Sequence, residues 1–334
     1  MESTSSGVAE RAYAPTPFTL GARYVAWSVV AMLFAFLVNV YLSFWRKWPG
    51  SDAAFGPDAP ALAWAQLSVY LLALAGPATY VLLTRGRSLR QDDALMTRIA
   101  AYIAAAAFWC VLLVGVADAV VSFLRVEGFL EDLFGHQLAQ DLGRNQFRAP
   151  YVHGPLIIAS LVIAAVTRPP GFTWLALLVV VAELQIVISR FVYSYEQAFM
   201  GDLVRMWYAG LFLFSSAYTL IEEGHVRVDV LYTNFSDRTK GLVNAIGSLC
   251  LGLPLCWTIL LLGMSSQASI ITSPLLALEV TQSGFGLYIK YLMAAFLAVF
   301  AVTMLIQFSA YFLEGVADYR ADPGKRKVES PSAS

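Results

Sequence analysis

Residues 207–232 read WYAGLFLFSSAYTLIEEGHVRVDVLY, an apolar run that ends in two glutamates, a histidine, an arginine and an aspartate. A helix rises about 1.5 Å per residue, so about 20 apolar residues are needed to cross the roughly 30 Å of hydrocarbon in a bilayer. A second apolar run begins shortly after the charged stretch, at residue 242. The pattern therefore predicts two membrane helices joined by a charged turn at a membrane surface.

The composition of the whole chain agrees with a membrane protein. Of its 334 residues, 58% are hydrophobic and only 13% are charged, which is unlike a soluble domain. The net charge is -1, so the overall charge gives no reason to expect a nucleic-acid partner. The partner that the composition does predict is the lipid bilayer.

Apolar runs long enough to cross a membrane recur along the chain. Seven are clear, at about residues 24–45, 61–83, 99–124, 172–191, 207–221, 242–264 and 287–313. An eighth, residues 154–166, is short, so it either includes the flanking Tyr151 and Val152 or forms a re-entrant half-helix. We therefore predict an all-α integral membrane protein with about eight transmembrane helices.

Lysine and arginine residues in the short loops predict the orientation. Three groups stand out: Arg85, Arg87, Arg90 and Arg98; Arg227, Arg238 and Lys240; and Arg320, Lys325, Arg326 and Lys327. With eight spans all three groups and both termini fall on one side, which should be cytoplasmic. With seven spans the later groups would change sides, so the charges favour eight.

Composition also divides the chain into segments. Residues 1–23 are polar, lack the pattern of a cleaved signal peptide and are expected to remain as a cytoplasmic segment. The sequence Arg-Pro-Pro-Gly at 168–171 interrupts any helix and separates a membrane part at 24–168 from a second at 169–319. Residues 320–334 are expected to form a disordered cytoplasmic tail.

Residues 126–142 have the spacing of an amphipathic helix. Phe129, Leu130, Leu133, Phe134 and Leu138 fall on one face, with acidic residues on the other. The helix is expected either to lie on the outer membrane surface or to pack on the protein as an ordinary loop helix.

Ionisable residues deep in the apolar runs are few. Asp118 lies near the end of the third run, and Glu183 lies in the middle of the fourth. A carboxylate in hydrocarbon must be paired, protonated or bound to a metal, so Glu183 is the best candidate for an ion or proton site. The alternative is a hydrogen bond between helices.

The remaining reactive side chains give no sign of an enzyme. His136, His153 and His225 are expected at or outside span ends, which argues against haem ligation within a bundle, and the three cysteines lie inside apolar runs. Motifs of metalloproteases, hydrolases and P-loop ATPases do not occur. We expect no cofactor, no metal and no catalytic residues.

Several motifs of the second half occur in an order that resembles a known family. Gln185 to Arg190-Phe191 is followed by Asp202-Leu203 to Arg205, then Gly224-His225 to Asp229, then Glu279 to Lys290. Over about residues 171–320 this resembles the small permease subunit (DctQ-type) of tripartite ATP-independent periplasmic, or TRAP, transporters. Such subunits usually have four spans, so this chain resembles a longer form with additional N-terminal helices.

The resemblance implies a function and partners. It implies a small subunit of a sodium-driven transporter in the bacterial inner membrane. This subunit would brace a large (DctM-type) permease subunit, which takes up an organic anion delivered by a periplasmic solute-binding protein. The alternative is a self-sufficient channel or carrier with Glu183 and Asp118 in the conduction path.

The resemblance also selects residues. Arg190, Asp202 and Arg205 are expected together near the outer interface, either at a surface for partners or each extending separately toward water. Trp207 is expected as an interfacial anchor. The remaining candidates for structural or partner contacts are Gln185, Gly224, His225, Arg227, Asp229 and Lys290.

Overall fold

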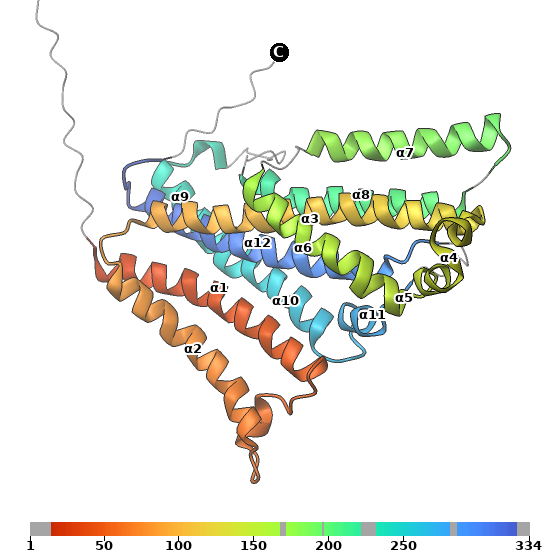
Figure 1. Cartoon of the computed structure of the whole chain (residues 1–334). Helices are drawn as coiled ribbons and strands as arrows, with labels where there is room; N and C mark the ends of the chain where they lie inside the picture. The colour runs from red at the N-terminus through yellow and green to blue at the C-terminus, as the bar shows by residue number, and fades with distance from the viewer. Residues whose placement is uncertain (1–14, 168–171, 196, 222–231, 281–285, 326–334) are drawn as a thin grey trace, which may run out of the picture.

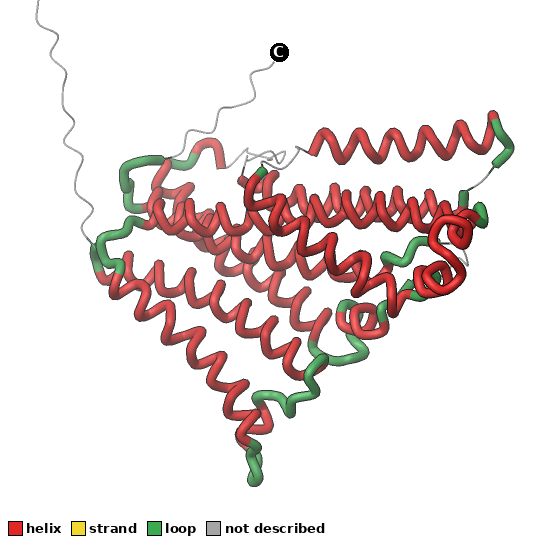
Figure 2. Tube along the Cα trace, in the orientation of Figure 1, coloured by secondary structure: helices red, strands yellow, loops and turns green. Residues whose placement is uncertain are grey.

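A computed structural model describes residues 15–325 except 168–171, 196, 222–231 and 281–285. Within these residues the chain consists of helices and connecting loops, with no strand (Figure 2). The prediction of an all-α protein is confirmed. The helices are α1 (Pro17–Phe44), η1 (Asp52–Phe55), α2 (Ala61–Leu83), α3 (Leu89–Val126), α4 (Phe129–Leu142), α5 (Asn145–Arg148), η2 (Ala149–His153), α6 (Gly154–Val166), α7 (Phe172–Val192), α8 (Ala198–Ile221), η3 (Tyr232–Asn234), α9 (Asp237–Gly247), η4 (Ser248–Gly252), α10 (Leu253–Met264), α11 (Thr272–Ala277) and α12 (Lys290–Tyr319).

Six helical segments of the described chain are long and apolar enough to cross a membrane: Pro17–Phe44, Ala61–Leu83, Leu89–Val126, Asn145–Val166, Asp237–Met264 and Lys290–Tyr319. The short run at 154–166 is therefore extended through η2 and α5, in line with the first of its two interpretations. Helices α7 and α8 occupy the other two predicted positions and have 21 and 24 residues. A total of eight crossings stays a prediction.

Helix α3 begins ten residues before the apolar run that predicted it. Ser88 accepts a hydrogen bond from the backbone N–H of Gln91, and the Gln91 side chain accepts one from the Ser88 N–H. This reciprocal capping starts the helix in the polar segment. Arg90 and Arg98, expected in the loop, consequently lie on α3.

Helices α3 and α12 form the centre of the bundle. Helix α3 packs against α12, α8 and α6, and α12 packs also against α9, α10 and α1. One apolar core gathers around α1, α3, α10 and α12, and a second around α3, α8 and α12. The peripheral helices α2 and α7 lie at opposite edges of the bundle (Figure 1). The first and second halves of the chain thus share both cores.

Helices α9 and α12 cross at two glycines. A Cβ added at Gly241 would lie 2.7 Å from the carbonyl oxygen of Gly315, and one added at Gly315 would lie 2.8 Å from that of Gly241. Such distances leave no room for a side chain. Small residues that let two backbones approach are a common means of packing helices in membranes, where burial gives little driving force.

Basic residues from distant parts of the sequence meet at one end of the bundle. Arg90 pairs with Asp318 at 2.9 Å, Lys325 with Asp237 at 3.4 Å, and Arg320 donates to the Thr16 hydroxyl at 3.2 Å. These contacts join the first residues of α1, α3 and α9 to the end of α12. We call this the basic end, and the far end the opposite end. The basic residues gathered at the basic end agree with the predicted orientation. The cytoplasmic location of the basic end stays a prediction.

The predicted amphipathic helix is present as α4 at the opposite end, with one difference. The chain leaves the helical conformation at Gly135 (φ 77°, ψ 163°), a combination that glycine adopts without steric cost, so α4 is bent. Leu130 is buried. The other apolar residues of the predicted face, Phe129, Leu133, Phe134 and Leu138, are exposed. Leu130, Ala139 and Leu142 instead pack against Val121 and Leu124 of α3 and against Phe147 and Val152. The location of α4 on the outer membrane surface stays a prediction.

Candidate functional site

A fully buried ion pair lies at the opposite end, within the bundle. Asp118 of α3 accepts a hydrogen bond from Arg148 Nη1 at 2.7 Å, and its Oδ1 also lies 3.0 Å from His153 Nε2. The side chains of all three residues have no exposed surface. Arg148 donates its other groups to the carbonyl oxygen of Leu142 at 2.7 and 2.9 Å.

Two tyrosines complete this group. The backbone N–H of Tyr288 donates to Asp118 Oδ2 at 2.7 Å, and the Arg148 guanidinium stacks 4.1 Å from the centre of the Tyr288 ring. The Tyr291 hydroxyl lies 2.8 Å from His153 Nδ1. We refer to Asp118, Arg148, His153, Tyr288 and Tyr291 as the junction cluster.

The Asp118 carboxylate can only accept hydrogen bonds, so His153 Nε2 carries a proton and donates to Asp118 Oδ1. The Arg148 guanidinium balances the charge of the Asp118 carboxylate. Burying either charge without the other would be far more costly.

The junction cluster connects sequence segments that are far apart. Asp118, Arg148 and His153 belong to the N-terminal part of the chain, whereas Tyr288 lies just before α12 and Tyr291 in its first turn. This satisfied network fixes how the N-terminal helices meet α12. Asp118 is thereby occupied by protein groups. His153, expected at or outside a span end, directly precedes α6 and is buried, and it donates to the Asp118 carboxylate.

A second buried pair lies at the basic end. Arg23 Nε of α1 donates to Asp92 Oδ2 of α3 at 2.6 Å, with no exposed surface on either side chain. Arg23 also donates to the carbonyl and hydroxyl oxygens of Thr84, at 2.9 and 2.8 Å. Trp27, Tyr80 and Arg87 donate to the same carboxylate. This network holds α1 and the end of α2 against α3.

The predicted group of Arg190, Asp202 and Arg205 forms only in part. Asp202 is buried, and its Oδ2 accepts a hydrogen bond from the backbone N–H of Leu287 at 3.1 Å. Arg205 reaches Asp202 at 3.5 Å, but its side chain is 76% exposed, so the pair is a weak surface contact. Arg190 is exposed and joins neither residue in the described contacts.

Trp207 and Lys290 were also predicted as site residues, and the structure buries the first and pairs the second. Trp207, expected as an interfacial anchor, is buried: its indole packs over Gly115 of α3, where an added Cβ would lie 2.7 Å from Nε1. Because Gly115 has no side chain, the Trp207 indole fits into the contact between α3 and α8. Lys290, at the first residue of α12, pairs with Glu279 at 2.6 Å, so both ends of the Glu279–Lys290 motif meet.

Glu183 lies on the exposed face of α7. Helix α7 packs mainly against α8, and Ala182 is buried on that side. Among the described residues Glu183 has neither an ion pair nor a hydrogen bond, and it faces outward rather than into a path between helices. The position does not favour conduction through this chain alone.

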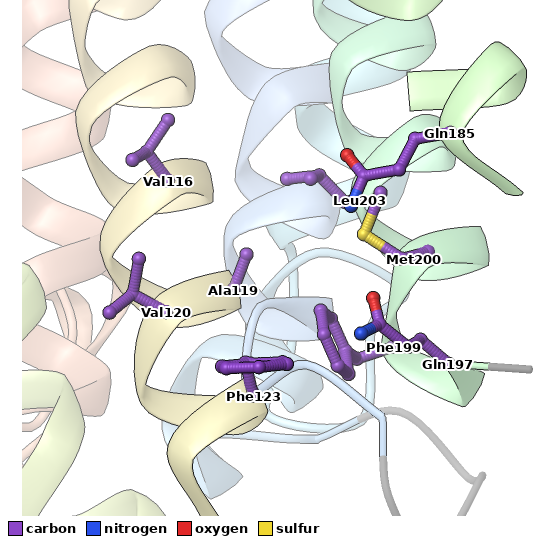
Figure 3. Close-up of a pocket in the computed structure, with 9 residues that line it drawn as sticks. All are labelled: Val116, Ala119, Val120, Phe123, Gln185, Gln197, Phe199, Met200 and Leu203. Carbon is purple, nitrogen blue, oxygen red and sulfur yellow. The ribbon is translucent and has the colours of Figure 1, made fainter. Parts of the chain in front are cut away.

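Gln185 borders a crevice between α3 and the α7–α8 pair. The crevice has a volume of about 360 Å³ and is lined by Val116, Ala119, Val120, Phe123, Gln185, Gln197, Phe199, Met200 and Leu203. Figure 3 shows apolar side chains of α3 facing those of α8, with the two glutamine amides on the α7–α8 side. The lining offers no ionised group.

The remaining predicted site residues, Gly224, His225, Arg227 and Asp229, lie outside the described residues. Within the part of the chain that the structure describes, no three His, Cys, Asp or Glu side chains gather in a way that could hold a metal ion.

Sequence reasoning missed Arg23, Asp92 and Arg148. A signal existed for Arg148. An aspartate inside an apolar run is commonly paired with a basic residue, and Arg148 and His153 flank the next apolar run. For Arg23 the signal was an arginine at the very start of a span, which is equally compatible with a residue that extends to the surface.

The second half of the chain matches a known family. Residues 176–316 match the family model described as "Tripartite ATP-independent periplasmic transporters, DctQ component". The match covers α7 to nearly the end of α12. No curated protein and no solved structure matches the chain.

Proposed function

Since residues 176–316 belong to the DctQ component family of TRAP transporters, whose members are small permease subunits, we propose that this chain braces a large permease subunit in the bacterial inner membrane. The large subunit moves the substrate using the sodium gradient, and a periplasmic binding protein delivers an organic anion to it. This chain contributes no substrate site of its own.

The observation that carries the proposal is the family match on a unit of four long helical segments: α7, α8, α9 with α10, and α12. The chemistry of the described side chains supports a scaffold. The charged side chains Arg23, Asp92, Asp118 and Arg148, which have no exposed surface, are paired with one another within the chain. Paired, fully buried charges fix the arrangement of helices and are not free to bind a transported ion.

The N-terminal helices extend this scaffold. Helix α3 contributes to both cores and is linked to Tyr288 and Tyr291 through the junction cluster, so the first half of the chain packs directly on the DctQ region. We therefore assign α1–α6 the role of widening the brace rather than forming a separate transport unit.

Co-purification tests the proposal. The tagged chain is expressed together with a large (DctM-type) permease subunit, and the membranes are solubilised in mild detergent. We expect the large subunit to be recovered with the chain in a fixed ratio. Recovery of the chain alone, under conditions where both proteins are present in the membrane, would contradict the proposed function.

A further inference from the structure

Helix α7 carries a carboxylate where hydrocarbon would be expected. Glu183 is eleven residues from the first residue of α7 and nine from the last, which places it about 16 and 14 Å from the two ends at about 1.5 Å per residue. For a helix that crosses a bilayer of about 30 Å, this is the middle of the hydrocarbon. An unpaired ionisable side chain at that depth is strongly unfavourable.

No described residue of this chain relieves that cost. Glu183 is exposed and has no partner among the described residues, and Val180 and Val187, one turn away on either side, are 61% and 48% exposed. Arg190, the basic residue on the same helix, is two turns away near its end. A Glu183 carboxylate that stays charged at this depth therefore needs a partner from outside the described residues.

Helix α2, at the edge of the bundle away from α7, provides a comparison within the same molecule. Helix α2 also packs mainly on one neighbour, α1, and exposes large apolar side chains such as Leu71 and Leu72. Yet α2 contains no Asp, Glu, Lys, Arg or His between its ends. Its face can contact lipid without an electrostatic cost, whereas the α7 face cannot.

We propose that the exposed face of α7 around Val180, Glu183 and Val187 is the docking surface for the large permease subunit, and that a helix of that subunit presents a hydrogen-bond donor to Glu183 at mid-membrane depth. The proposal rests on the proposed function and adds the surface and its chemistry. A lysine, arginine or hydroxyl group would meet the requirement, because each donates to a carboxylate. Apolar side chains on either side of Glu183 would exclude water and lipid from the pair.

Crosslinking tests the surface. A photoreactive amino acid is placed at Val180, at Val187 or, as a matched control on another exposed helix face, at Leu72 of α2, in the full chain expressed with the large subunit. We expect adducts with the large subunit from both α7 positions and none from Leu72. Adducts from Leu72 alone, or α7 adducts only with a second copy of this chain, would overturn the docking surface. Either result leaves the proposed function intact if the two subunits still co-purify.

Substitution of Glu183 tests the pairing. Glu183→Leu would leave the partner's donor buried and unpaired, and we expect the dissociation constant of the two purified subunits to rise by roughly 30-fold or more. Glu183→Gln keeps an acceptor at the same place and should bind more tightly than Glu183→Leu. If Glu183→Leu binds the large subunit as well as the unmodified chain does, Glu183 faces lipid and the proposed pairing is wrong.

Discussion

Asp118 is the central acceptor of the hydrogen bonds that hold the junction cluster together. It accepts from Arg148, His153 and the backbone of Tyr288, and the side chains of Asp118, Arg148 and His153 have no exposed surface. Each of these donors would lose its acceptor if the carboxylate were removed. The arginine would suffer most, because its charge would remain buried without compensation.

We therefore expect Asp118→Ala to destabilise the folded protein by about 3–5 kcal/mol. Asp132→Ala is the matched control, since Asp132 is exposed on α4 and its loss should change stability by less than about 0.5 kcal/mol. Unfolding in a series of detergent mixtures, followed by circular dichroism, measures both. Equal stability of the two variants would contradict the role of the junction cluster.

At the scale of elements, the places where helices touch follow from small residues as much as from apolar ones. Gly115 admits the Trp207 indole between α3 and α8, and Gly241 and Gly315 bring α9 and α12 together. Apolar runs in the sequence predicted where most helices lie, because length and hydropathy suffice for that. Apolar runs did not predict these contacts. The sequence does not show which helix a glycine in an apolar run will face.

The α9–α12 crossing gives a direct prediction. In Gly241→Ala the new methyl group would lie 2.5 Å from the backbone nitrogen of Tyr319. The helices would have to separate, and we expect the free energy of unfolding to fall by about 1–3 kcal/mol. Gly247→Ala is the control on the same helix, where an added Cβ meets nothing within 4 Å. It should be neutral or slightly stabilising, because alanine favours helix. A lower thermal midpoint for Gly247→Ala than for Gly241→Ala would refute this interpretation.

At the scale of the whole molecule, the sequence predicted the fold class, the DctQ region and the gathering of basic residues at one end. It predicted the candidate site less well. Arg23, Asp92 and Arg148 were missed because a buried charge is recognised by its partner, and the partners lie 69 and 30 positions away along the chain. The burial of Trp207 was not predicted for a related reason, since the glycine that accommodates it belongs to α3.

The orientation is open to a separate measurement. Gly86, between α2 and α3, and the C-terminus should both lie in the cytoplasm if the chain crosses the membrane eight times. Fusions of alkaline phosphatase and of green fluorescent protein at each position report the side. A periplasmic signal at Gly86 would contradict the eight-span arrangement and with it the assignment of the basic end.

The function of the assembled molecule is the central claim, and reconstitution tests it most directly. Sodium-driven uptake of the binding protein's ligand is measured in liposomes that contain this chain alone, the large permease subunit alone, or both. We predict uptake only when both subunits are present together with the binding protein. Uptake by this chain without the large subunit would show that it transports by itself and would contradict its role as a brace.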